Sequence, residues 1–354
     1  MVAGVMRKLI PVVFLLAACG KSSDQAPAPA AADRPSQGKL EKMPKLILEN
    51  DPQRDAKVAF GHALFFDKRM SSDGTRACYS CHQNEDGNGG HDPLAVGPGD
   101  KTLTRHSPVI WNAAYWNADL YWDGRAKDLE SNAKGAWGGG NMGVGNDNLE
   151  AKASELYAIP GYKALFDAAF PNTQPMAGNF ETALAYYERT LICDDTAYDR
   201  FAGGDKGALD EAQQRGLDVF LGKAGCATCH APPFFSTAMA TPGGVYHNVG
   251  IGTAKAEADV DVGRMKVSQK PEDWAAFKPP SLRNVSKSAP YFHDGSVKTL
   301  DDAVALMLAG GIPNKNKSKL LNKVALSDAE RSDLISFLGA LDCPGKLDPP
   351  ASMP

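Results

Sequence analysis

Two five-residue stretches carry the residue types and the spacing of a metal-cofactor attachment site. Each reads C-x-x-C-H, the first at residues 78–82 and the second at residues 226–230. The spacing lets two thiols add across the two vinyl groups of one haem, and the next residue then supplies an axial imidazole. Zinc sites and redox dithiols also use C-x-x-C, but neither requires a histidine directly after the second cysteine. The motifs therefore predict two c-type haems, bound through four cysteines: Cys78, Cys81, Cys226 and Cys229.

The composition limits the classes of protein to which the chain can belong. Its 354 residues are 43% hydrophobic and 23% charged, which is typical of a soluble globular protein of up to two domains. The formal net charge is -4, from 38 basic and 42 acidic residues. This balance argues against nucleic acid as a partner, because phosphate binding needs a basic surface.

The N-terminus has the features of an export signal. Arg7 and Lys8 precede an apolar run, residues 9–18, that is too short to span a bilayer. The run ends in Leu-Ala-Ala-Cys, which resembles a bacterial lipoprotein signal covering residues 1–19, with Cys19 as the lipid-modified residue. An ordinary secretory signal with an incidental cysteine is the alternative. Residues 20–45, rich in Ala, Pro and Ser, are predicted to be a flexible tether. We thus expect a periplasmic lipoprotein that meets the membrane only through its anchor.

Two further cysteines, Cys193 and Cys343, are left over from these assignments. Disulfides persist in exported proteins, so the two residues could be bonded to each other. Two separate buried thiols are an equally good interpretation, because the sequence gives no distance between them.

The haem motifs must be positioned by helices, and a repeated pattern precedes each of them. A helix is expected to begin at Asp51-Pro52, with Asp51 as its N-cap, and to contain Gly61–Phe65; the pattern G-x-x-aliphatic-Phe returns at Gly216–Phe220. This predicts an internal duplication of a cytochrome c-like unit, with haem domains at residues 46–200 and 201–345. Further helices are expected after Thr299 and after Ser327. Strand signals are few, so the fold class is mainly α.

The chain resembles the bacterial di-haem cytochrome c peroxidases over residues 50–342. The resemblance rests on the two haem motifs and on segments 122–126, 280–285 and 289–295, which follow one another along the chain as they do in that family. The resemblance implies that His82 is the proximal ligand of an N-terminal peroxidatic haem and His230 that of a C-terminal electron-entry haem. Met307 stands where the family has the axial methionine of the second haem, a ligand that raises the potential. A core methionine on an apolar helix face is the alternative.

The same resemblance assigns roles between the haems. Trp122 matches a tryptophan that carries electrons from one haem to the other, with ordinary core packing as the alternative. The carbonyl groups of Ser288 and Pro290, with the side chain of His106, match a calcium site. The family often has asparagine where His106 stands, so calcium is only a possible cofactor.

Two departures from the family pattern bear on catalysis. Pro98, in Gly97-Pro98-Gly99, occupies the place of a distal histidine and cannot bind iron, which predicts an open first haem; His91 is the nearest substitute. Asn141 occupies the place of a glutamate that serves as acid and base in peroxide cleavage. An asparagine donates a hydrogen bond but cannot shuttle a proton, a contribution typically worth ~10²–10⁴ in rate.

The leading functional hypothesis is a peroxidase that reduces hydrogen peroxide to water with electrons from a small donor protein, a cytochrome c or a cupredoxin. One alternative is a di-haem oxidase that modifies a protein partner, like the enzyme that matures methylamine dehydrogenase. That enzyme uses tyrosine as a ligand of the second haem, where this chain has Met307. The other is an electron-carrying lipoprotein without catalysis. A homodimer is one expected assembly, which the sequence leaves open.

Overall fold

A computed structural model of the chain describes residues 1, 40–46, 50–116, 119–241 and 243–354. The described residues from 40 onwards belong to one compact unit. The predicted signal peptide with Cys19, and the predicted tether as far as residue 39, lie outside the described residues.

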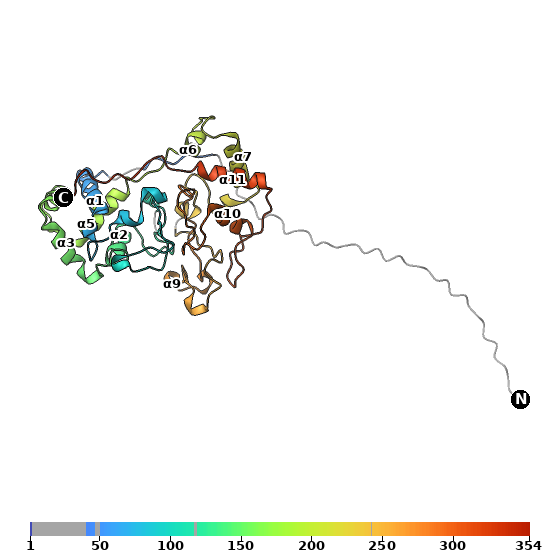
Figure 1. Ribbon diagram of the computed structural model, residues 1–354, viewed down its shortest axis with the longest axis horizontal. Coiled ribbons are helices and arrows are strands. Elements are labelled where there is room, and N and C mark those ends of the chain that lie inside the picture. Colours follow the sequence, from blue (N-terminus) through green and yellow to red (C-terminus); the bar gives the residue numbers. More distant parts are fainter. Residues whose placement is uncertain (2–39, 47–49, 117–118, 242) are drawn as a thin grey trace. The chain divides into compact units, whose positions relative to one another are not determined.

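The described part of the chain is helical, with β-structure there limited to isolated bridges (Figure 1). Its α-helices are α1 (Arg54–Phe66), α2 (Leu129–Gly138), α3 (Leu149–Tyr157), α4 (Pro160–Ala169), α5 (Ala177–Glu188), α6 (Ala197–Ala202), α7 (Glu211–Leu221), α8 (Thr237–Ala240), α9 (Met265–Ser268), α10 (Leu300–Leu308) and α11 (Asp328–Gly339). The prediction of a mainly α fold is confirmed.

Helix starts follow the predicted caps in the second half and depart from them in the first. The side chain of Thr299 accepts from the backbone of α10, and Ser327 and Glu330 form the predicted reciprocal box at α11. The prediction for α1 is wrong, because the helix begins at Arg54 rather than after Asp51. One oxygen of the Asp51 carboxylate accepts from the Gln53 N–H at 2.9 Å, and the other accepts from the Lys57 ammonium and the Tyr186 hydroxyl, each at 2.6 Å.

The repeated glycine of the two halves lies where two helices cross closely. α1 packs on α5, and α7 packs on α11, as Figure 1 shows. A Cβ atom added at Gly61 would lie 1.9 Å from the Ala183 carbonyl oxygen of α5. A Cβ atom added at Gly216 would lie 2.0 Å from the Asp333 carbonyl oxygen of α11. Glycine is therefore required at both crossings, and the repeated sequence pattern corresponds to a repeated packing.

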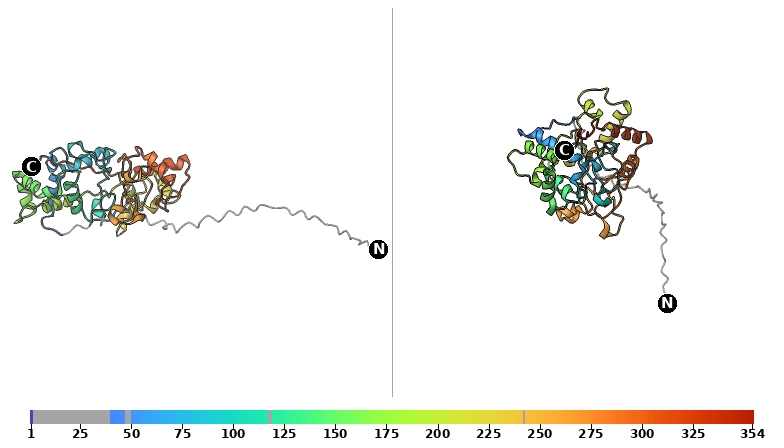
Figure 2. Two further views of the ribbon diagram at one scale, coloured as in Figure 1. Left: turned by 90° about the horizontal axis from the view of Figure 1, so that it is seen from below. Right: turned by 60° about the vertical axis from the view of Figure 1, so that its left-hand side comes forward.

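Two aromatic cores accompany these helix pairs. In the first core, Phe60 of α1 makes edge-on contacts with four rings: Tyr162, Phe166, Phe170 and Phe180. In the second core, Phe220 of α7 contacts Phe235 and Phe337. Figure 2 shows the blue and green segments of the first half and the orange and red segments of the second half as two groups. The limits of the two haem domains at residues 200 and 201 stay a prediction.

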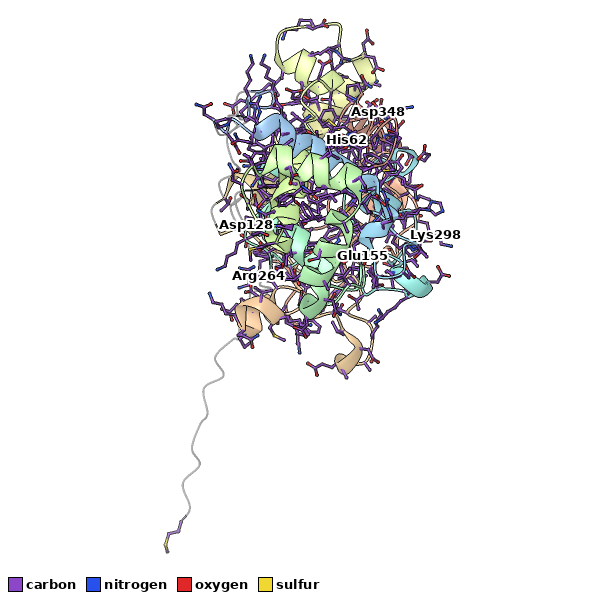
Figure 3. The ribbon with its side chains drawn as sticks, turned by 90° about the vertical axis from the view of Figure 1, so that its left-hand side faces the viewer. His62, Asp128, Glu155, Arg264, Lys298 and Asp348 are labelled. Atoms are coloured by element: carbon purple, nitrogen blue, oxygen red, sulfur yellow. A yellow bond between two sulfur atoms is a disulfide. The ribbon has the colours of Figure 1, made fainter. Side chains whose placement is uncertain are left out.

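The C-terminal segment returns from the second half to the first. A disulfide joins Cys193 to Cys343, which resolves the two interpretations that the sequence left open. Beyond it, the Asp348 carbonyl lies 2.6 Å from His62 Nε2 of α1, a pair seen side by side in Figure 3. The Arg69 guanidinium donates to the Pro354 carbonyl at 2.8 Å. The segment thus fastens the last residues of the chain against α1.

The end of the predicted tether is packed rather than free. Met43 is buried in a small cluster with Tyr115 and Met239, and the Tyr115 hydroxyl donates to the Pro44 carbonyl at 2.6 Å. Met43 and Pro44 thus contact the folded part of the chain, and the tether boundary at residue 45 stays a prediction. In the described residues no helix is both long enough and apolar enough to cross a membrane.

Candidate functional site

The first C-x-x-C-H motif lies at the wall of a large cavity. Residues Cys78–Cys81 form one turn of 3₁₀ helix after α1, and Cys78, Cys81 and His82 all line the cavity. Its volume is about 1650 Å³, compared with ~300–1,000 Å³ for an ordinary small-molecule pocket. Burial raises the pKa of both thiols above the usual range. A cavity of this size, with two neutral thiols and an imidazole on one wall, fits a covalently attached haem.

His82 is held in the orientation that an iron ligand needs. Its Nδ1 atom lies 3.1 Å from the Asn88 carbonyl oxygen, which leaves Nε2 available for a metal. Asn88 also donates from its amide to the His82 carbonyl at 3.2 Å, and the Trp111 indole N–H donates to the Asn88 amide oxygen at 2.7 Å. Burial lowers the pKa of His82 to about 4. The imidazole is thus neutral, the form that binds iron.

The second motif also forms a 3₁₀ turn after a helix, and its histidine has two backbone acceptors where His82 has one. Residues Cys226–Thr228 form one 3₁₀ turn after α7. His230 Nδ1 lies 3.1 Å from two carbonyl oxygens, those of Phe235 and Pro280. Burial lowers the pKa of His230 to about 4 and raises the pKa of Cys226 to about 12. These residues also fit a covalent haem.

Met307 lies on α10, close to the end of that helix. The core contacts of α10 are made by three other side chains: Leu300, Val304 and Leu308. Met307 is half-buried. A half-buried thioether is free to bind a metal, but its role as the ligand opposite His230 stays a prediction.

Trp122 is fixed by residues from both halves of the chain. Its indole N–H donates to the His106 carbonyl at 2.8 Å, and its own carbonyl accepts from the Lys278 N–H at 3.0 Å. The next residue, Asp123, is paired with Arg105 at 2.7 Å, and Arg105 is paired with Asp261 at 2.6 Å. The tryptophan lines the cavity at the junction of the halves. This position suits the predicted relay, which stays a prediction.

The three residues predicted to bind calcium line the same cavity. His106 Nδ1 lies 2.9 Å from the Asp92 carbonyl oxygen, so this nitrogen already has a partner. Pro290 follows a cis peptide bond with Ala289, and Ser288 directly precedes Ala289. Calcium prefers oxygen ligands, and the described residues contain no group of three His, Cys, Asp or Glu side chains that could hold a metal ion. A calcium ion here would rest on backbone carbonyls, and the site stays a prediction.

The two departures from the family pattern have clear structural positions. Pro98 begins a turn that packs against the loop containing Gly143. The two segments are so close that a Cβ atom added at Gly143 would lie 3.2 Å from the Pro98 ring. The His91 side chain is 77% exposed, and its Nδ1 atom lies 3.0 Å from the Asp86 carboxylate. His91 is therefore directed to solvent and is no substitute for a distal ligand. Asn141 lines the cavity, as does Asn132 of α2.

Sequence reasoning missed two buried titratable groups in this cavity. Lys278 donates to the Asp119 carbonyl at 2.7 Å, and its ammonium lies 3.4 Å from the centre of the Trp116 ring. Burial lowers the pKa of Lys278 to about 7. Glu188, at the end of α5, is the other group. Only Glu188 had a signal in the sequence, because it follows Leu184 by four residues on the buried face of its helix.

The fold and the two motifs define a mainly helical protein with two covalently attached haems, built from two similar halves. The chain belongs to the di-haem cytochrome c peroxidase family: the family model of that name matches residues 55–207. The cytochrome-c peroxidase IdrP1 of a Pseudomonas species (strain SCT) is 34% identical, over 84% of this chain and 84% of its own length. Family membership implies two haem c groups.

Two further comparisons widen the range of relatives. The methylamine utilization protein MauG of Methylorubrum extorquens is 34% identical, over 82% of this chain and 79% of its own length. A solved MauG-like protein associated with microbial copper homeostasis superposes with a TM-score of 0.74 at 27% identity, covering 90% of this chain and 97% of its own. The predicted arrangement of two cytochrome c-like halves is confirmed by this likeness. The relatives include both peroxidases and MauG proteins, so they establish a haem oxidoreductase rather than one reaction.

Proposed function

We propose that this protein is a di-haem cytochrome c peroxidase, which reduces hydrogen peroxide to water with electrons from a small periplasmic redox protein. The observation that carries the proposal is the open face of the first haem site. His82 adjoins the large cavity, Pro98 turns away into a neighbouring loop, and His91 is directed to solvent. Because neither Pro98 nor His91 supplies a ligand at this site, room is left for a small substrate.

The proposed roles follow from the contacts of each residue. When bound, the haem at His82 would supply the iron that activates peroxide, and the haem at His230 would accept electrons singly. His82 and His230 hold their haems through Nε2, because Nδ1 of each is satisfied by backbone carbonyls. Trp122 lies between the halves as the relay, and Asn141 orients the substrate through a hydrogen bond.

The test of the function is electron paramagnetic resonance of the oxidised protein, followed by a peroxidase assay. We expect a high-spin ferric signal from the open first haem and peroxide-dependent oxidation of reduced cytochrome c. Two low-spin signals with no high-spin iron would overturn the open site. Peroxide consumption without donor oxidation, together with oxidation of a protein partner, would favour instead an oxidase of the kind suggested by the similarity to MauG.

Met307 is proposed as the axial ligand that gives the second haem its high potential. Met307→His should lower this potential, because imidazole stabilises ferric iron better than a thioether does. Spectroelectrochemical titration measures the change. Leu306→His, on the neighbouring position of α10, is the matched control and should leave the potential unchanged. Equal potentials in the wild type and the Met307 variant would make Met307 a packing residue.

The remaining proposals concern location and partners. The signal at residues 1–19 supports export and a lipid anchor at Cys19, with a cytochrome c or a cupredoxin as donor. Cys19→Ser should move the protein from the membrane fraction to the soluble periplasmic fraction. Unchanged fractionation would favour an ordinary secretory signal. A homodimer and a calcium ion at the carbonyls of Ser288 and Pro290 are proposed on the family resemblance alone.

A further inference from the structure

One carboxyl group that lines the cavity beside His82, that of Glu188, has no role in the proposed function. Glu188 ends α5, and Leu184, one turn earlier, lines the same cavity. The Glu188 residue is only 7% exposed. The carboxyl therefore lies on the buried face of the helix and borders the space where the first haem and its substrate would lie.

The Glu188 carboxyl is buried without a compensating partner. Within the described part of the chain, no side-chain or backbone group forms a hydrogen bond with it. The adjacent Arg189 is paired with Glu130 at 2.8 Å instead. An ionised carboxylate is costly to bury alone, so the group keeps its proton. Burial raises the pKa of Glu188 to about 8, and the Arg189 charge offsets this only in part.

Glu188 shares its cavity with residues of the proposed reaction site. Cys78, Tyr121, Asn132 and Asn141 line the same cavity. An ionised Glu188 would be the second cause, after burial, of the raised pKa of the Cys78 thiol. The carboxyl therefore lies within electrostatic reach of the point where the first haem is attached. The two amides donate hydrogen bonds but hold no transferable proton, whereas the Glu188 carboxyl holds one.

We propose that Glu188 supplies the proton for cleavage of the peroxide O–O bond, the task that Asn141 cannot perform. The inference rests on the proposed peroxidase function. As the O–O bond breaks, its electron pair leaves with the outer oxygen, which takes the carboxyl proton of Glu188 and departs as water. The hydrogen of the inner oxygen restores the carboxyl. Two electrons from the donor protein and two protons from solvent then convert the inner oxygen to the second water.

The first experiment compares Glu188→Gln with Glu181→Gln in the haem-loaded protein. Glu181 lies on the same helix, two turns earlier, and serves as the matched control. Glu188→Gln should slow peroxide cleavage about 10²-fold or more, as expected for loss of a general acid, while Glu181→Gln should not. The wild-type rate should fall above about pH 8, and this limb should vanish in Glu188→Gln. An active wild type with an unchanged rate in Glu188→Gln would overturn the inference.

A second readout does not depend on turnover. The resting protein at neutral pH should show the infrared carbonyl band of a protonated carboxylic acid, and the band should be absent in Glu188→Gln. A wild type without the band overturns the inference whatever the substrate. A wild type with the band but no peroxide reduction overturns the proposed function instead. If Glu188→Gln does not acquire its haems, Glu188→Asp replaces it. A fall of the rate at the same pH as in the wild type would then count against the inference.

Discussion

The two halves of the molecule share a scaffold and differ in the surroundings of the histidine. In both, a helix with a glycine crosses a partner helix closely, and a 3₁₀ turn carries the C-x-x-C-H motif. In the first half the histidine has one backbone acceptor at 3.1 Å and borders a cavity of about 1650 Å³. In the second half it has two acceptors at 3.1 Å each.

The difference teaches that the segments between the repeated elements decide the chemistry. The first half places α2, α3 and α4, with their glycine-rich connections, between the motif and α5. These segments supply the two amides, Asn132 and Asn141, that line the cavity. The second half places α8 to α10 between the motif and α11. The Nδ1 atom of its histidine, His230, lies close to the carbonyl oxygens of Phe235 and Pro280, which belong to separate segments. One half is thus suited to substrate access and the other to a fixed coordination.

The largest expected effect is the loss of one haem without the other. Replacing Cys78 and Cys81 by alanine should remove the first haem, and replacing Cys226 and Cys229 should remove the second, because each pair attaches its own group. Mass spectrometry of the acid-denatured protein should find two haem additions in the wild type and one in each variant. Release of both haems from the denatured wild type would contradict covalent attachment.

The next effect concerns the covalent link between the halves. The Cys193→Ala/Cys343→Ala protein should lose about 2–5 kcal/mol of unfolding free energy. The first haem should be disturbed more than the second. The reason is that Asn284 accepts from the Cys343 N–H at 2.6 Å and donates to the Gly87 carbonyl at 3.0 Å, near the His82 loop. Denaturant titration followed at each haem band measures both quantities. Equal shifts of the two bands would argue against this asymmetric coupling.

Substitutions at Gly61 and Gly216 test whether the two helix crossings contribute equally to the free energy of unfolding. Gly61→Ala and Gly216→Ala should each cost about 1–3 kcal/mol, because the new methyl group would press on a backbone carbonyl. Gly178→Ala in α5 and Gly339→Ala in α11 are matched controls with no atom within 4 Å of the added Cβ. These controls should be neutral or slightly stabilising. A loss at only one crossing would show that the duplication is not preserved in packing.

The sequence predicted those features that depend on local spacing. The C-x-x-C-H motifs, the repeated glycine pattern and the caps at Thr299 and Ser327 need only neighbouring residues, and the structure contains each repeat and cap. The start of α1 was mispredicted, because residues 52–53 form a turn before the helix, in which Asp51 accepts from the Gln53 N–H. The contact of Lys278 with Trp116 could not be predicted, since only the fold brings these residues together.

The same limit applies to the acid of the cavity. Glu188 is separated from the first motif by more than a hundred residues, and only the packing of α5 on α1 carries it to the cavity wall. The disulfide was an open choice for a similar reason, because it depends on a distance of 5.5 Å between two Cα atoms that lie 150 residues apart in sequence. Long-range packing, rather than propensity, decides both.

The smallest effect separates the halves at their helix ends. α7 begins with a reciprocal box in which the Asp210 carboxylate accepts from the Gln213 N–H at 2.8 Å, whereas α1 begins at Gln53 without a side-chain cap. Asp210→Ala should therefore cost ~1 kcal/mol, and Gln53→Ala should cost almost nothing. Both residues open the helix that leads to a haem motif, so each variant is the control of the other. Unfolding midpoints at constant haem content measure the two costs. If the costs are equal, the first half has a compensating contact at its start, for which the Asp51–Lys57 pair is the first candidate.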